Sequence, residues 1–223
     1  MKISLNWMRT FGVFGVFGGL ILFTGDMLLY YHPINLDLKQ NMGNASDIRI
    51  ITSGISALFA TWFYMLGLIQ VYYAFMPAKP FFRNGVLISF GSILIAYGIV
   101  HAAFIAIAAT AKLATEHNLN INEAVLLSQK TNELLRFFVY PMFGVLSVLF
   151  ISQVWKRKTL YPRWIIFFFP LILFLIEDIV TRYLPGNIWI IIKGGYLNLI
   201  LVIFFSASTI ALWNIKKSDN INQ

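Results

Sequence analysis

The chain has 223 residues, of which 59% are hydrophobic and only 12% are charged, and it contains no cysteine. Soluble domains are about 45–50% apolar and about 25% charged, so the composition indicates a chain embedded in lipid. The absence of cysteine excludes disulfides, thiolate metal sites and cysteine nucleophiles.

A transmembrane helix needs about 20 mainly apolar residues, and six runs in the sequence meet this length. They cover residues 11–31, 50–76, 85–111, 134–154, 161–182 and 189–213. The first run continues to Tyr31 without a small-residue cleavage site, so we expect a retained helix rather than a signal peptide. No segment outside the runs is long enough for a soluble domain. The prediction is an all-α polytopic membrane protein, with residues 1–223 forming one bundle of six transmembrane helices.

Four short segments hold most of the basic residues: the N-terminus, the second loop, the fourth loop and the C-terminal tail. The fourth loop is the densest, with Lys156, Arg157, Lys158 and Arg163. By the positive-inside rule, both termini are predicted to be cytoplasmic. Because these residues flank hydrophobic runs and form no separate basic face, the net charge of +8 does not favour nucleic-acid binding. The abundance of Asn, Ile, Lys and Phe is typical of AT-rich bacterial genomes, so the predicted location is the bacterial inner membrane.

The loop between the third and fourth runs carries a helix-start signal. Asn120 followed by Glu123 is similar to an N-terminal capping box. This pattern predicts a short amphipathic helix between the third and fourth spans. The alternative is an extension of the fourth span toward its N-terminus.

Asp26, His101 and Glu177 are ionisable residues that lie inside three of the hydrophobic runs. A charge in the hydrocarbon core costs several kcal/mol unless it faces the bundle interior and has a partner. Each residue lies 15 or 16 positions after the predicted cytoplasmic start of its run, which at 1.5 Å per residue places all three at one depth in the outer half of the bundle. We therefore expect the three side chains to converge.

Further polar residues are expected around this level because they share helix faces or lie near the external ends of the return helices. The predicted binding residues are Tyr30, Tyr97, Arg136, Asp178, Lys193 and Asn198. The alternative is purely structural: Asp26 and Glu177 would form ion pairs with Arg136, Lys193 or Arg182.

The first functional hypothesis is a protein that binds or processes a small apolar or lipid-like molecule. His101 would be a base or a ligand, and Asp26 and Glu177 would be an acid, a ligand or an orienting group. The same three residues are the candidates for a divalent metal site, and Arg136 or Lys193 would hold an anionic headgroup. Whether the protein is an enzyme stays open at this stage, as does its oligomeric state.

Two other hypotheses remain. Intramembrane carboxylates and a histidine are the usual groups of a proton-coupled transporter, and Pro170 inside the fifth run would kink that span. The third hypothesis is a structural membrane component in which the polar cluster only fixes helix packing. A haem with two axial histidines is not expected, because only His101 lies well inside a span.

The segment from Phe23 to Tyr31, with Gly25-Asp26 at its centre, resembles bacterial multipass membrane proteins grouped as a domain of unknown function. The histidine in the third run and the Glu-Asp pair late in the fifth belong to the same resemblance. It implies a six-span layout and brings no activity with it.

Overall fold

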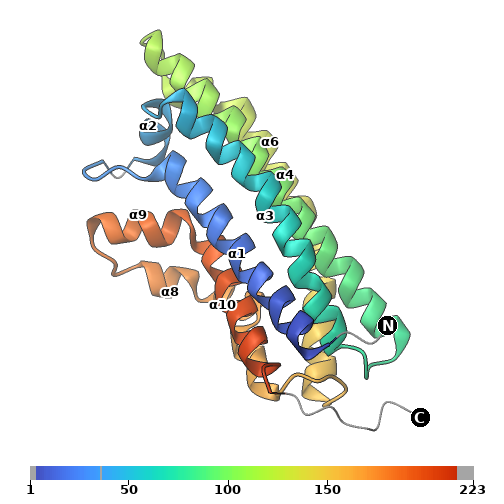
Figure 1. Ribbon diagram of the computed structural model, residues 1–223. Coiled ribbons are helices and arrows are strands. Elements are labelled where there is room, and N and C mark those ends of the chain that lie inside the picture. The colour runs from blue at the N-terminus through green and yellow to red at the C-terminus, as the bar shows by residue number, and fades with distance from the viewer. Residues whose placement is uncertain (1–3, 36, 215–223) are drawn as a thin grey trace.

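The computed structural model describes residues 4–35 and 37–214, and every regular element within them is a helix (Figure 1). The all-α class is therefore confirmed. The elements are α1 (Leu5–Tyr30), α2 (Leu38–Gly43), α3 (Asp47–Ala74), α4 (Pro80–Glu116), α5 (Ile121–Ala124), α6 (Leu126–Trp155), the 3₁₀ helix η1 (Arg163–Phe168), α7 (Pro170–Leu175), α8 (Glu177–Thr181), α9 (Gly186–Gly194) and α10 (Tyr196–Ala211).

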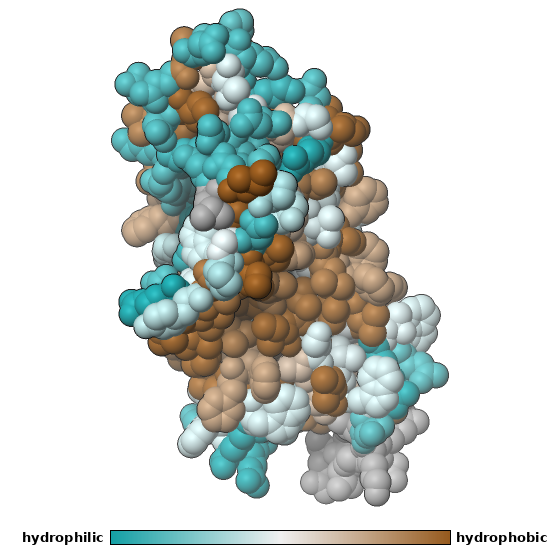
Figure 2. All heavy atoms as spheres, turned by 90° about the vertical axis from the view of Figure 1, so that its left-hand side faces the viewer, coloured by the Kyte–Doolittle hydropathy of each residue, from teal (hydrophilic) through white to brown (hydrophobic). Residues whose placement is uncertain are grey.

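Four long helices, α1, α3, α4 and α6, are apolar and long enough to cross a membrane. They match the first four predicted runs, with α4 and α6 extending several residues beyond the predicted ends. In Figure 1 they lie side by side along one axis, and α10 packs on α1. On the face shown in Figure 2, an apolar band separates two hydrophilic ends, as expected for a protein that spans a bilayer.

Close packing between α1 and α3 depends on glycine. A β-carbon at Gly67 of α3 would lie 2.6 Å from the Cα atom of Gly15 on α1. A β-carbon at Gly12 would lie 2.2 Å from the Gln70 side-chain nitrogen. Small residues let transmembrane helices approach closely. Here they bring α1 and α3 close enough for polar side chains of one helix to contact the other.

The fifth predicted span, residues 161–182, is wrong as a continuous helix. Phe169 is extended (φ −69°, ψ 138°) because it precedes Pro170, which opens α7, and the chain breaks again at Ile176. The segment is thus η1, α7 and α8 in succession. A constant rise of 1.5 Å per residue does not apply to it, so the depth assigned to Glu177 by counting was unfounded.

The sixth predicted span, residues 189–213, is also wrong as a single straight helix. It consists of α9 and α10, whose axes differ by 68°. At the bend, a β-carbon on Gly195 would lie 2.3 Å from the Phe23 ring of α1, so the close approach of that ring requires glycine. The described residues contain four helices able to cross a membrane, or five if the bent pair is one span, rather than six.

The loop after α4 combines both of the alternatives expected for it. Asn120 accepts hydrogen bonds from the backbone N–H groups of Asn122 and Glu123, which confirms the predicted cap. The helix that it starts, α5, is only four residues long, and α6 follows directly from Leu126. The fourth span is therefore extended toward its N-terminus after a single capped turn.

The end of the bundle that holds the start of α1 and the end of α10 is tightly packed. Aromatic rings fill it, with Phe150 stacked on Phe169 at a centroid distance of 4.5 Å. A buried hydrogen-bonded chain runs from Tyr161 through Ser208 to Gln70, which donates to the carbonyl of Met8. This packing closes that end of the bundle. The polar site described next lies farther along the helices, toward the opposite end.

Candidate functional site

A cavity of about 490 Å³ lies between the long helices and the α7–α10 segment. Ligand sites for small molecules usually have volumes of about 300–1,000 Å³. Eight of the nine residues singled out from the sequence line it: Asp26, Tyr30, Tyr97, His101, Arg136, Glu177, Lys193 and Asn198. Asp178 is the exception, because its side chain is exposed on the outer side of α8.

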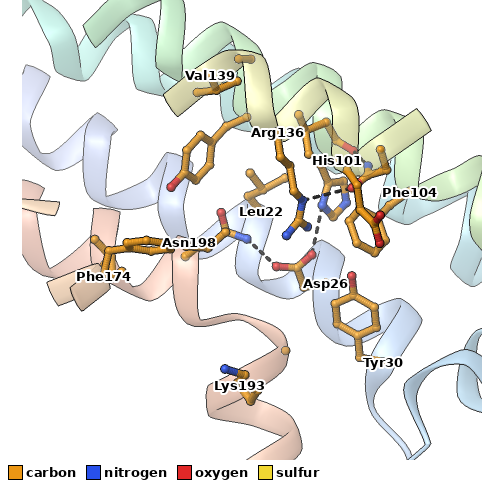
Figure 3. Close-up of a pocket in the computed structure, with 18 of the residues that line it drawn as sticks. Leu22, Asp26, Tyr30, His101, Phe104, Arg136, Val139, Phe174, Lys193 and Asn198 are labelled. Atoms are coloured by element: carbon orange, nitrogen blue, oxygen red, sulfur yellow. Dashed lines mark hydrogen bonds and ion pairs between the residues drawn. The ribbon is translucent and has the colours of Figure 1, made fainter. Parts of the chain in front are cut away.

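Asp26 is the centre of the polar cluster. One carboxylate oxygen lies 3.1 Å from Nδ1 of His101, and the other accepts a hydrogen bond from the amide of Asn198 (Figure 3). All three residues are at least nine-tenths buried. Asp26 and His101 are each 21 residues past the start of their helices (26 − 5 and 101 − 80), so the expectation that they share one level is confirmed.

Ser53 of α3, which the sequence reasoning missed, holds the other side of the imidazole. Its hydroxyl donates to the carbonyl of Gly25 at 2.8 Å and lies 3.1 Å from Nε2 of His101. Because the serine proton is directed to Gly25, Nε2 is the donor in the second contact and carries a proton. Nδ1, on the opposite edge of the ring, faces the Asp26 carboxylate.

The order Ser53–His101–Asp26 is that of a nucleophilic catalytic triad. Ser53, however, is fully buried and is not among the residues that line the cavity. Its hydroxyl faces the α1 backbone at Gly25. The arrangement therefore orients His101 instead of presenting a nucleophile to a substrate.

Arg136 of α6 is positioned by two contacts. Its Nε donates to Asn132 at 3.0 Å, and the Asn132 amide donates to the carbonyl of Val100 on α4 at 2.8 Å. The guanidinium carbon lies 5.0 Å from the centre of the Phe104 ring, a favourable cation–π distance. The pairing of Asn132 with Arg136, four residues apart on α6, directs the guanidinium toward the cavity (Figure 3).

Glu177 does not join Asp26 and His101, so the expected convergence of three side chains is only partly realised. Its carboxylate pairs with Lys193 at 2.7 Å, and Lys193 also lies 3.3 Å from Asp178. The structural alternative, in which Glu177 forms an ion pair, is thus the one found. In the described part of the chain, no three His, Asp or Glu side chains are grouped to hold a metal ion, which removes the arrangement of His101, Asp26 and Glu177 as metal ligands.

Most of the cavity wall is apolar, and sequence reasoning missed it. Leu22, Ile93, Val139, Phe143, Phe174 and Ile200 contribute to it. In the sequence these residues look the same as those that face lipid, so only the packing of the helices identifies them. Lys39, Gln129 and Glu133 extend the lining toward α2 and the start of α6.

Four or five apolar helices with charged side chains turned inward define the class: this is a multi-pass α-helical membrane protein. More particularly, the chain belongs to a family of unknown function (DUF6796), whose model matches residues 1–217. The resemblance to a domain of unknown function is thereby confirmed. Comparison with curated proteins and with solved structures gives no match.

Proposed function

We propose that this membrane protein binds a small apolar or lipid-like molecule with a polar end in the cavity. The observation that carries the proposal is the distribution of side chains around one cavity. Asp26, His101, Arg136 and Asn198 gather at one level, and the remaining wall is mostly aliphatic and aromatic. A largely apolar pocket with a few convergent polar groups is the usual form of a ligand site.

We further propose that the protein lies in the bacterial cytoplasmic membrane with both termini inside. Arg9 of α1 donates to the carbonyl of Trp213, just beyond α10, so the described ends of the chain lie at the same end of the bundle (Figure 1). The basic fourth loop lies at that end too, as the positive-inside rule requires for a cytoplasmic face. The cavity is then in the outer half of the bundle.

One observation favours a second function, proton-coupled transport. Asp26 and His101 are in contact beside the cavity, and intramembrane pairs of this kind handle protons in carriers. Against it, the aromatic packing around Phe150 and Phe169 closes the route to the other end. Substrate-dependent proton uptake by vesicles containing the purified protein would favour the carrier, and binding without uptake would favour the first proposal.

The binding proposal is tested by filling the cavity. Ala96 of α4 lines it, whereas Ala102 on the same helix is exposed and does not. We expect native mass spectrometry of the gently purified protein to show a co-purified small molecule. Ala96→Phe should remove it, and the matched change Ala102→Phe should leave it in place. The proposal would be contradicted if both variants retained the molecule equally. It would also be contradicted if the wild type bound no molecule when incubated with lipid extracts.

A further inference from the structure

We infer that the ligand carries an anionic headgroup bearing a hydroxyl, that Arg136 binds the anion, and that Asn198 accepts the hydroxyl hydrogen bond. This inference rests on the proposed function and deepens it by naming the ligand class. Both side chains face the same space beside Asp26 (Figure 3).

Arg136 is a cation prepared for an anion. Its one hydrogen bond within residues 4–35 and 37–214 uses Nε, so both terminal nitrogens are free to donate. An arginine fork of this kind matches the oxygens of a carboxylate or a phosphate. Asn132 and the Phe104 ring already fix the guanidinium, so little side-chain freedom is lost when an anion binds.

Lys193 and Asp26, two other charged residues predicted for this site, already have protein partners. Lys193, the alternative headgroup residue, is held by the carboxylates of Glu177 and Asp178. Asp26 forms no ion pair with Arg136; its two oxygens contact His101 and Asn198 instead. Among the described residues, no carboxylate forms an ion pair with Arg136, so a ligand anion would give this guanidinium the partner that it lacks.

Asn198 supplies the second feature. Its side-chain nitrogen donates to Asp26, while its side-chain oxygen is buried and has no hydrogen-bond partner in the described part of the chain. Buried acceptors are nearly always satisfied. Asn198 is 4% exposed and lines the cavity, and its unpartnered oxygen is buried beside that space. We infer that a ligand hydroxyl next to the anionic group supplies the missing donor when the ligand binds.

The experiment compares four single-chain probes of equal length on the purified protein in uncharged detergent: palmitate, 3-hydroxypalmitate, palmitoyl lysophosphatidic acid and monopalmitoylglycerol. The carboxylates and the phosphate distinguish the two sources of the anion. The hydroxyl of 3-hydroxypalmitate is tested against palmitate, and monopalmitoylglycerol is the uncharged reference. We expect the wild type to bind at least one class of anionic probe about tenfold more tightly than the uncharged one, and 3-hydroxypalmitate more tightly than palmitate.

Arg136→Gln should abolish the preference for the anion and change the Kd of monopalmitoylglycerol less than about twofold. Arg182→Gln, which removes the same charge outside the cavity, should have no such effect. If Arg136→Gln does not fold, the wild type is compared with Arg136→Lys instead. The two measurements are the salt dependence of probe binding and the order of affinity for the four probes.

The outcomes separate this inference from the proposed function. If monopalmitoylglycerol binds as well as the anionic probes, or if the preference survives Arg136→Gln, the inference is overturned and the cavity remains a site for apolar molecules. If palmitate and 3-hydroxypalmitate bind equally, the role of Asn198 is overturned. If no probe binds the wild type and Ala96→Phe changes nothing, the proposed function itself fails.

Discussion

His101 of α4 meets Asp26 of α1 at the level of the cavity, with Nδ1 of the imidazole 3.1 Å from a carboxylate oxygen. The two residues are 75 positions apart in sequence (101 − 26), and they meet because α1 and α4 run in the same direction from the same end of the bundle. The contact joins the two helices, and its two partners are the most buried ionisable groups of Asp, Glu, His, Lys and Arg type among the described residues.

The first prediction concerns the energetic coupling of this pair. Removing one partner of a buried ion pair costs about 3–5 kcal/mol, because the other is left uncompensated. Asp26→Asn and His101→Gln should therefore each lower the free energy of unfolding in detergent. The double variant should lose clearly less than the combined single losses, by about 0.5–3 kcal/mol. Additive losses would mean that the two side chains do not interact.

The second prediction separates an orienting serine from a nucleophile. Ser53→Ala should cost about 1–3 kcal/mol of stability, because Gly25 and His101 lose a hydrogen-bond partner. Since Ser53 lies outside the cavity lining, the Kd of a bound amphiphile should change little. Loss of turnover of an ester or amide amphiphile, at unchanged stability, would instead identify Ser53 as a nucleophile.

The site could be predicted from sequence where chemistry alone singles out a residue. Asp26 and His101 are conspicuous because charges are costly in lipid, and their helices are regular enough for counting to give their level. Glu177 was misplaced because Pro170 and the break at Ile176 destroy that regularity. Ser53 and the apolar wall gave no signal, since serine and aliphatic residues are ordinary in membrane helices.

The third prediction tests the glycine contact between α1 and α3. Gly67→Ala would place a methyl group against the Gly15 backbone, and overpacking of this kind costs about 1–3 kcal/mol. Gly144→Ala on α6 is the matched control, because a β-carbon there meets nothing within 4 Å. It should be neutral or stabilising by up to about 1 kcal/mol. Thermal unfolding of both variants in the same detergent measures the difference, and equal stability would contradict the close packing.

The fourth prediction concerns orientation and uses the absence of cysteine from the chain. Single cysteines introduced at Lys158 and at Asn122 should react with a membrane-impermeant thiol reagent from opposite sides of the membrane. The proposed topology places position 158 in the cytoplasm, so only position 122 should be labelled in intact cells. Labelling of position 158 alone under the same conditions would reverse the orientation. Labelling of both positions would show that α6, the one span between them, does not cross the membrane.

We propose that the cavity beside Asp26 and His101 holds an amphiphile. An experimental density map of the protein in lipid nanodiscs is the measurement that would show the bound molecule itself. We expect elongated density along the apolar wall formed by Val139, Phe174 and Ile200. This density should end within hydrogen-bonding distance of Arg136 and Asn198. A cavity collapsed onto its own side chains, with α8 and α9 folded into the space and Arg136 paired to a protein carboxylate, would contradict it.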